Sequence, residues 1–297
     1  MDTNIDAKVV TNTLNGLRVQ TNLILGRPNS LPERSTINEQ LNIMTDLKPG
    51  SDQKPEARYM TIGNRGHSVD MSDPTLIIPF PVQHRPTDVG AWGPIPFVLR
   101  PVANDLADSI RGNYALRTLE VHDNQQYWAY YAKRLDHSTV TTQDWELTVS
   151  DGVQTVKEFY YTDAHLHSKP PVLPNYNFDV TDQIVLADGK YVYTNATIKM
   201  TLDENDIKEL INVAKIKYKD PRKAIVSEFI LCSGVDHIAT GESFTSSAFQ
   251  YMEVAGLQAI VFLNSFNSAA LSNVEIGYDV VIGQTEPMPV DTGATVS

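Results

Sequence analysis

The segment Asp163-Ala164-His165-Leu166-His167 holds the residue types of a metal site at a spacing of two. On an extended backbone, residues two apart lie on the same face, so the carboxylate and both imidazoles would converge. The segment runs into Ser168-Lys169-Pro170-Pro171, which is typical of a surface loop. We therefore treat Asp163, His165 and His167 as weak candidates for a metal-dependent enzyme, and expect solvated histidines without a metal or cofactor.

Cys232 is the only cysteine of the chain, and Asp236-His237 follows it closely. A cysteine nucleophile needs a base and an activating environment. Cys232 instead ends the apolar run Ile230-Leu231, which indicates a small buried thiol. Residues 224–231 are expected to form a strand that Cys232-Ser233-Gly234 ends. The sequence also lacks the glycine-rich phosphate-binding patterns, the Gly-x-Ser-x-Gly elbow and the His-Glu-x-x-His motif. We therefore predict that the protein is not an enzyme, and we assign no catalytic residue.

Aromatic residues gather between Tyr127 and Tyr131, and Trp145 follows further along. Because successive strand residues face opposite sides, Trp128 would share a face with Tyr130. Such rings form a stacking platform in a host-receptor or glycan-binding module, which is one interpretation of this group. The interpretation that we favour packs one face into a core and turns the other toward a partner.

Arginines punctuate the first third of the chain, within segments that hold few core-forming residues. Their planar guanidinium groups suit bidentate contacts with carboxylates of another protein, although ordinary surface cations are the alternative. Together with four aromatic residues they form the predicted interface: Arg27, Arg34, Arg58, Arg65, Arg85, Trp92, Phe97, Trp128 and Tyr130.

The first 119 residues are predicted to form two segments outside the core domain. Residues 1–60 are expected to form an extended N-terminal arm, with a short hairpin at Asn15-Gly16 between apolar groups. A short helix is expected to begin at Ser35 or Thr36, where Glu39 completes a capping box. Residues 61–119 combine many prolines with large apolar side chains, so we predict an ordered excursion that packs on the core or on a neighbour.

Residues 120–287 are predicted to form a β-rich core domain. Asp151-Gly152 and Asp188-Gly189 each separate two runs of strand-forming residues, as in β-hairpins. Residues 203–219 carry a helical apolar face and follow a capping box. Residues 288–297 are expected to form a flexible tail. The predicted fold is mainly β (α+β), with an antiparallel β-sandwich-like core, one principal amphipathic helix and long extended N-terminal arms.

Composition restricts the class of protein. The 297 residues include 24 basic and 36 acidic side chains, and a formal charge of −12 argues against direct nucleic-acid binding. One cysteine excludes an internal disulfide. The N-terminal residues lack a signal-peptide pattern, and the longest apolar runs are far shorter than the roughly 20 residues of a membrane span. We expect a protein made in the cytoplasm, without membrane contact.

Several segments resemble virion structural proteins of large tailed bacteriophages. They are residues 27–41, 96–100, 130–136, 209–216 and 228–236. The resemblance extends over most of residues 20–290 and implies a particle component, but it brings no active-site residues with it. It therefore implies a virion location, reached by assembly in the host cytoplasm.

The expected function is that of a structural subunit of a tailed-phage virion. It would form a symmetric ring in the neck, collar or tail and connect adjoining layers, with itself and other virion structural proteins as partners. A baseplate component is the alternative within this class. A host-receptor or glycan-binding module and, third, a metal-dependent enzyme belong to other classes.

Overall fold

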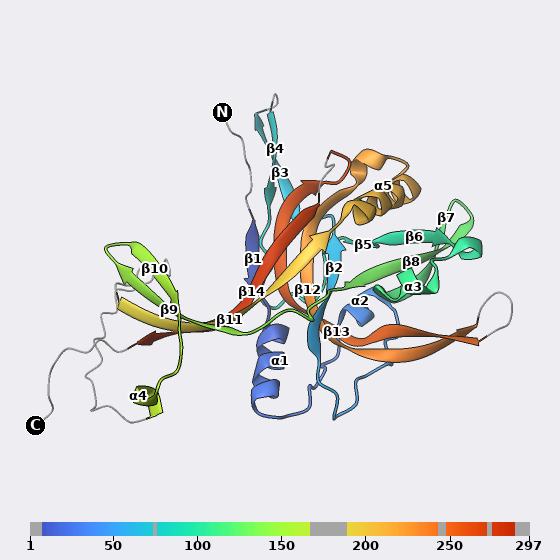
Figure 1. The fold of residues 1–297 in the computed structure, drawn as a ribbon. Helices are drawn as coiled ribbons and strands as arrows, with labels where there is room; N and C mark the ends of the chain where they lie inside the picture. The colour runs from blue at the N-terminus through green and yellow to red at the C-terminus, as the bar shows by residue number, and fades with distance from the viewer. Residues whose placement is uncertain (1–7, 74–75, 167–188, 243–247, 272–274, 289–297) are drawn as a thin grey trace, which may run out of the picture. The chain divides into compact units, whose positions relative to one another are not determined.

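The computed structural model describes residues 8–73, 76–166, 189–242, 248–271 and 275–288. It has a mainly β fold with antiparallel sheets, as predicted (Figure 1). The strands are β1 (Val9–Asn12), β2 (Glu56–Gly63), β3 (His67–Asp73), β4 (Leu76–Pro81), β5 (Pro94–Ile95), β6 (Val98–Pro101), β7 (Tyr114–His122), β8 (Gln125–Arg134), β9 (Gln143–Ser150), β10 (Val153–Glu158), β11 (Gly189–Leu202), β12 (Ile225–Glu242), β13 (Ala248–Ser268) and β14 (Ile276–Met288).

The helices are short except for two of them. They are α1 (Leu14–Ile24), α2 (Ile37–Leu41), α3 (Asp108–Arg111), α4 (Asp163–Leu166) and α5 (Glu204–Tyr218), with 3-10 turns at η1 (Val102–Asn104) and η2 (Pro221–Lys223). The chain divides into two compact units, and this division differs from the predicted segments. Unit 1 consists of residues 1–136 and 200–278, and unit 2 of residues 137–199 and 279–297.

Unit 1 is built on a sheet with the strand order β1-β13-β12-β2-β8-β6, in which β5 also pairs with β2 and β7 with β8. β2 lies between β12 and β8, so residues 56–63, which fall across the end of the predicted N-terminal arm, form an inner strand. Its side chains from Tyr59 to Ile62 are almost fully buried. The second predicted segment likewise contributes β6 and β7, so both segments are part of this unit's core.

The principal helix lies where the sequence predicts it. α5 begins after Asp203, whose side chain accepts hydrogen bonds from the backbone of Asn205 and Asp206. The buried face includes Ile207, Leu210 and Ala214, as expected from their helical spacing. Arg100 of β6 forms a bidentate ion pair with Glu209, which ties the outer face of the helix to the sheet.

The capping box predicted at Thr36 is also confirmed. The Thr36 side chain accepts a hydrogen bond from the Glu39 backbone, and the Glu39 carboxylate accepts one from the Thr36 backbone. Four groups donate to the Glu39 carboxylate, namely the backbone N–H groups of Arg34, Ser35 and Thr36 and the Thr36 hydroxyl, and these bonds hold its pKa below the ordinary value.

The hairpin predicted at Asn15-Gly16 is wrong, because both residues lie within α1. Thr13 caps this helix by accepting a hydrogen bond from Gly16 N, and its hydroxyl donates to Ala259 O of β13 at 2.7 Å. Gly16 faces β13 so closely that a Cβ would lie 2.9 Å from the Ile260 carbonyl oxygen. The glycine therefore serves a close helix–strand contact rather than a turn.

β12 and β13 form the longest hairpin of unit 1 (Figure 1). The sequence predicts that Cys232-Ser233-Gly234 ends the first strand, but β12 continues to Glu242. Register shifts near these residues mark β-bulges, which bend a strand without ending its pairing. Beyond Gly234 the hairpin continues as a distal ribbon, which comprises residues 235–242 and 248–255.

Unit 2 contains the hairpin predicted at Asp151-Gly152, which joins β9 to β10. Its sheet has the order β10-β9-β11-β14, and the unit boundary falls within β11 and β14. The turn predicted at Asp188-Gly189 includes Asp188, which lies outside the described residues, as does most of the predicted tail 288–297.

Candidate functional site

The predicted metal segment does not have the geometry that the prediction assumed. Asp163 and His165 lie in the short helix α4, so residues two apart do not share a face, and His167 lies outside the described residues. The His165 ring accepts a hydrogen bond from Thr162 N at 2.9 Å and packs edge-on against Phe159. Within the described ranges, no cluster of three metal-ligating side chains is found.

Cys232 is fully buried, as expected. Its Sγ lies 3.7 Å from the Thr61 hydroxyl, and burial raises the pKa of the thiol to about 12. The thiol therefore stays protonated at neutral pH and is a poor nucleophile. Asp236 forms ion pairs with Arg58 and Arg134. It is thus part of an arginine network rather than a partner that orients His237 as a base for the thiol.

The predicted aromatic platform is divided between the two units. Tyr130 and Tyr131 are 1% and 7% exposed in the core of unit 1, while Trp145 lies in unit 2. The Arg117 guanidinium covers the Trp128 ring at 4.1 Å. These positions agree with core packing and exclude a platform formed by the whole group.

The predicted interface residues have different environments. Phe97 and Tyr130 lie in the core of unit 1, which leaves no side-chain surface for a partner. Arg58 pairs with Glu56 and Asp236 of its own chain. Trp92 is 41% exposed, although one face of its ring stacks on His84. The remaining predicted arginines are exposed: Arg27, Arg34, Arg65 and Arg85.

A buried polar array fastens the Pro-rich excursion to the sheet of its own unit. His84 lies between two carboxylates: Nδ1 is 2.9 Å from Asp88 Oδ2, and Nε2 is 2.9 Å from Glu228 Oε1. Glu228 also accepts hydrogen bonds from the backbone N–H groups of Trp92 and Gly93. The His84 ring stacks between Trp92 and Phe262, at 3.7 and 3.8 Å between centroids. His84 and Glu228 are almost fully buried, so this array fastens the excursion from within the core.

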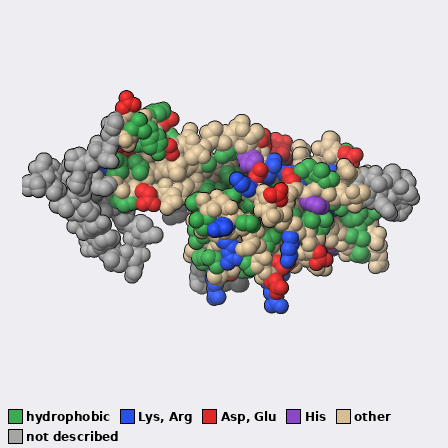
Figure 2. Space-filling view, turned by 90° about the horizontal axis from the view of Figure 1, so that it is seen from below, with side chains coloured by type: hydrophobic (Ala, Val, Ile, Leu, Met, Phe, Trp, Pro, Cys, Tyr) green, Lys and Arg blue, Asp and Glu red, His purple; other side chains and the backbone are tan. Residues whose placement is uncertain are grey.

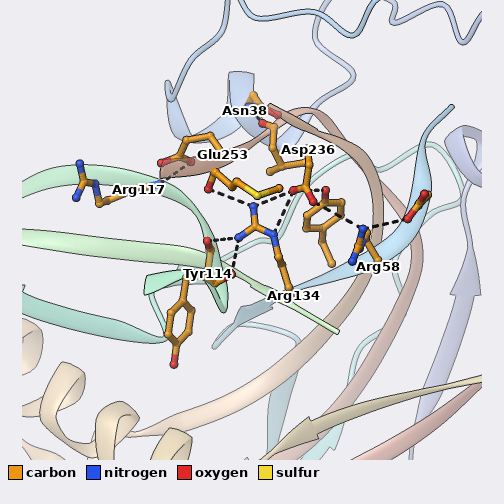
Figure 3. A network of polar contacts seen from close by, with 12 residues as sticks. Asn38, Arg58, Tyr114, Arg117, Arg134, Asp236 and Glu253 are labelled. Atoms are coloured by element: carbon orange, nitrogen blue, oxygen red, sulfur yellow. Dashed lines mark hydrogen bonds and ion pairs between the residues drawn. The ribbon is translucent and has the colours of Figure 1, made fainter. Parts of the chain in front are cut away.

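A second network supports the base of the distal ribbon (Figure 3). The Arg134 guanidinium at the end of β8 donates to Asp236 of β12 and to backbone oxygens of Tyr114 and Met252. The Tyr59 hydroxyl donates to the same Asp236 oxygen at 2.8 Å. One guanidinium thus joins β8, β7, β12 and β13 where the ribbon leaves the sheet.

Glu253 adds a buried acid to this region (Figure 3). Its carboxylate is 2% exposed and accepts a hydrogen bond from Arg117 N at 3.2 Å. Leu116 has a φ of +55°, which turns successive backbone N–H groups toward the carboxylate. Burial raises the pKa of Glu253 to about 7, although these donors and two nearby arginines act in the opposite direction.

The outer side of the distal ribbon carries an apolar pair. Ile238 and Met252 lie opposite each other in the β12–β13 register and are 61% and 44% exposed. Among the described residues, β2 pairs with β12 only as far as Gly234, and β1 pairs with β13 only at residues 261–264. No described strand therefore pairs with the ribbon beyond these residues, although Glu253, Val254 and Ala255 at its base are buried in unit 1.

α1 turns apolar side chains away from the body of unit 1. Its inner face uses Asn15, Gly16 and Val19, all of which are buried. The outer face carries four exposed residues, here named the α1 stripe: Leu14, Leu17, Ile24 and Leu25, which are 50%, 55%, 83% and 64% exposed. Figure 2 shows hydrophobic and basic side chains together on the side of unit 1 that carries α1. This pattern was visible in the sequence as apolar residues at helical spacing.

Unit 2 contains an open groove on one face of its sheet. Its volume is about 330 Å³, and strands β9, β10, β11 and β14 all contribute to it. The Tyr193 ring lies in the groove and stacks on Trp145 at 6.4 Å between centroids. The Trp145 indole N–H donates to Asn195 Oδ1 at 3.2 Å, which fixes the orientation of that amide.

The fold and these surfaces define a mainly β protein of antiparallel sheets, with exposed apolar surfaces on unit 1. The chain matches a model of a family of unknown function (DUF7208) over residues 1–297, and therefore belongs to that family. Searches of curated proteins and of solved structures found no match. No described helix is both long and apolar enough to cross a membrane.

Proposed function

We propose that the protein is a structural subunit of a tailed-phage virion, which assembles into a symmetric ring in the neck, collar or tail and connects adjoining layers. The observation that carries this proposal is the outward apolar surface of unit 1, made of the α1 stripe and the Ile238–Met252 pair. Assignment to a virion, and assembly in the host cytoplasm, rest on the sequence resemblance.

Both surfaces belong to a unit whose core is formed without them. The core of unit 1 includes fully buried side chains such as Tyr59, Leu116 and Phe262. Large apolar side chains that remain exposed at neighbouring positions are typical of protein interfaces. The α1 stripe would bury its leucines against another copy, and the distal ribbon would bury its exposed Ile238–Met252 pair.

Different surfaces at α1 and at the ribbon favour a ring over a two-fold dimer. A contact between unlike patches of two copies is heterologous, and repeated rotation closes it into a ring. The neutral α1 stripe and the apolar ribbon pair are chemically compatible partners for such a contact. A baseplate component remains the alternative, because the same contacts would serve there.

The test is the mass of the full-length protein in solution. Size-exclusion chromatography with light scattering and negative-stain microscopy should show a closed oligomer for the parent protein. Leu17→Glu with Ile24→Glu, and separately Ile238→Glu, should each shift the mass to the monomer because a charge would be buried in the contact. Leu271→Glu is the matched control, since Leu271 lies in a turn, outside both surfaces, and is 87% exposed.

Two outcomes would contradict the proposal. A parent protein that stays monomeric at high micromolar concentration would remove self-assembly. Purified phage particles that contain the protein in no fixed copy number by mass spectrometry would remove the virion assignment, whatever the result in solution. Circular dichroism of each variant excludes unfolding as the cause of a lost oligomer.

A further inference from the structure

We infer that the groove of unit 2 binds a neutral saccharide. The groove has a volume of about 330 Å³, at the lower end of the range of small-molecule sites. It lies on one face of the unit 2 sheet, and its described lining includes no residue of the α1 stripe or the distal ribbon. Its lining includes Leu147, Gln154, Val156, Tyr193, Asn195 and Gln284.

The described lining of the groove is uncharged, and this restricts the charge of the ligand. Among the described residues, it contains no Asp, Glu, Lys, Arg or His, although such residues are common in the chain. Glu146 of β9 faces the opposite side of the sheet, where it pairs with Lys157 at 2.9 Å and with Lys190 at 3.5 Å. On β14, the exposed Glu286 accepts a hydrogen bond from the lining residue Gln284 at 3.0 Å. An anionic ligand would therefore find no counter-charge along the described lining, and we take the ligand to be neutral.

The polar groups of the lining match hydroxyl groups. Gln154, Asn195 and Gln284 present carboxamides, a group that both donates and accepts hydrogen bonds. Because Gln284 Nε2 donates to Glu286, the Gln284 oxygen is the end that can bind a ligand. Thr285 adds a hydroxyl group with the same dual capacity. A saccharide carries hydroxyl groups that donate and accept in the same way, whereas an apolar ligand would leave these carboxamides unpaired.

The apolar part of the groove matches the C–H face of a sugar ring. Tyr193 provides an aromatic ring, and Leu147 and Val156 lie beside each other on neighbouring strands. Trp145 supports this surface from within the same unit, because it stacks on Tyr193 and holds the Asn195 oxygen. The amide nitrogen of Asn195 is therefore the end that can donate to a ligand.

The position of the groove favours a saccharide over an added peptide strand. Peptides that extend a sheet bind to its unpaired backbone edge. Here the lining consists mainly of side chains on the face of four strands, including inner strands β9 and β11. Gly283 of β14 allows a close approach to β11, because a Cβ at this position would collide with the Thr194 carbonyl oxygen.

The experiment uses the full-length protein and defined probes. Maltotriose, cellotriose, chitotriose and a glycan array of neutral bacterial polysaccharides are tested by saturation-transfer NMR and by tryptophan fluorescence. We expect saturable binding of at least one saccharide. Gln154→Ala and Asn195→Ala should each weaken it about tenfold, since each removes hydrogen bonds to the ligand. Thr148→Ala, on the opposite face of β9, should bind like the parent protein.

Three results would overturn the inference: no saturable binding across the panel, equal binding by the parent and both groove variants, or binding of an unstructured peptide library at the groove in place of any saccharide. Gln154 is exposed on β10, so its variant is expected to fold. Assembly of unit 1 is measured separately and depends on other residues, so failure here would leave the proposed function standing.

Discussion

The two units differ in how they bury their side chains. In unit 1, large residues such as Tyr59, Phe97 and Phe229 are completely buried, and charged groups such as Glu228 are buried with partners. In unit 2, all six described residues of β10 are exposed, and the most buried residues of β9 include Leu147 and Val149. Unit 1 is thus held by a closed core with internal polar networks, while the described sheet of unit 2 turns much of its surface outward.

The largest difference should appear when a charge is introduced into each unit. Leu210→Asp places a carboxylate on the buried face of α5 and should lower the free energy of unfolding by about 4–5 kcal/mol. Val153→Asp in unit 2 should change it by less than about 1 kcal/mol, because Val153 is 65% exposed. Urea denaturation of both variants measures the difference. Equal losses would mean that the two units are buried alike.

Histidine substitutions extend the comparison to polar groups. His84→Ala removes the ring between Trp92 and Phe262 and one partner of the buried Glu228, which should cost about 3–4 kcal/mol. His165→Ala in unit 2 removes an exposed ring and should cost no more than about 0.5 kcal/mol. Thermal unfolding of the two variants provides the measurement. A stable His84 variant would show that the array does not hold the Pro-rich excursion.

Replacing the buried acid Glu253 with Gln should stabilise the protein, and only at high pH. Burial raises the pKa of Glu253 from 4.5 to about 7, so the folded state binds this proton more tightly than the unfolded chain. The stability associated with this proton is complete below about pH 4.5 and is lost as the pH rises through about 7. Glu253→Gln should therefore match the parent near pH 4.5 and exceed it by ~3 kcal/mol at pH 8.

The matched control for this pH effect is Glu286→Gln in unit 2. Glu286 is exposed, so the variant should keep the pH dependence of the parent protein. Denaturation midpoints between pH 5 and pH 8 for parent and variants provide the measurement. A Glu253→Gln variant with the same pH slope as the parent would show that this carboxyl group is not desolvated.

Local sequence signals predicted the elements that depend on neighbouring residues. The α5 face, the Thr36–Glu39 capping box and the Asp151-Gly152 turn all involve groups a few residues apart. The hairpin prediction at Asn15-Gly16 was wrong because a hairpin signal depends only on adjacent residues. Gly16 instead serves a contact with Ile260, which is distant in the sequence. Cys232-Ser233-Gly234 misled in the same way, since β2 and β13 keep the bulged strand paired.

The candidate sites were less predictable than the fold. The α1 stripe could have been found, because Leu14, Leu17 and Ile24 are at helical spacing, but the Asn-Gly signal competed with it. The groove of unit 2 combines residues of four strands, and the register that brings them together cannot be predicted from any single segment. The pairing of His84 with Glu228 likewise joins distant segments, so no local pattern indicated either partner.

The pairing of β1 with β13 determines when the protein can be completed during synthesis. Val10 pairs with Leu263, and Thr13, which caps α1, donates to Ala259. A ribosome releases residues 9–13 long before residues 259–264, so β1 has no partner strand until β13 has emerged. The α1 stripe therefore reaches its final position only after β13 has been synthesised. Shorter nascent chains would lack this surface, and under the proposed function the order of synthesis itself would keep them out of an assembly.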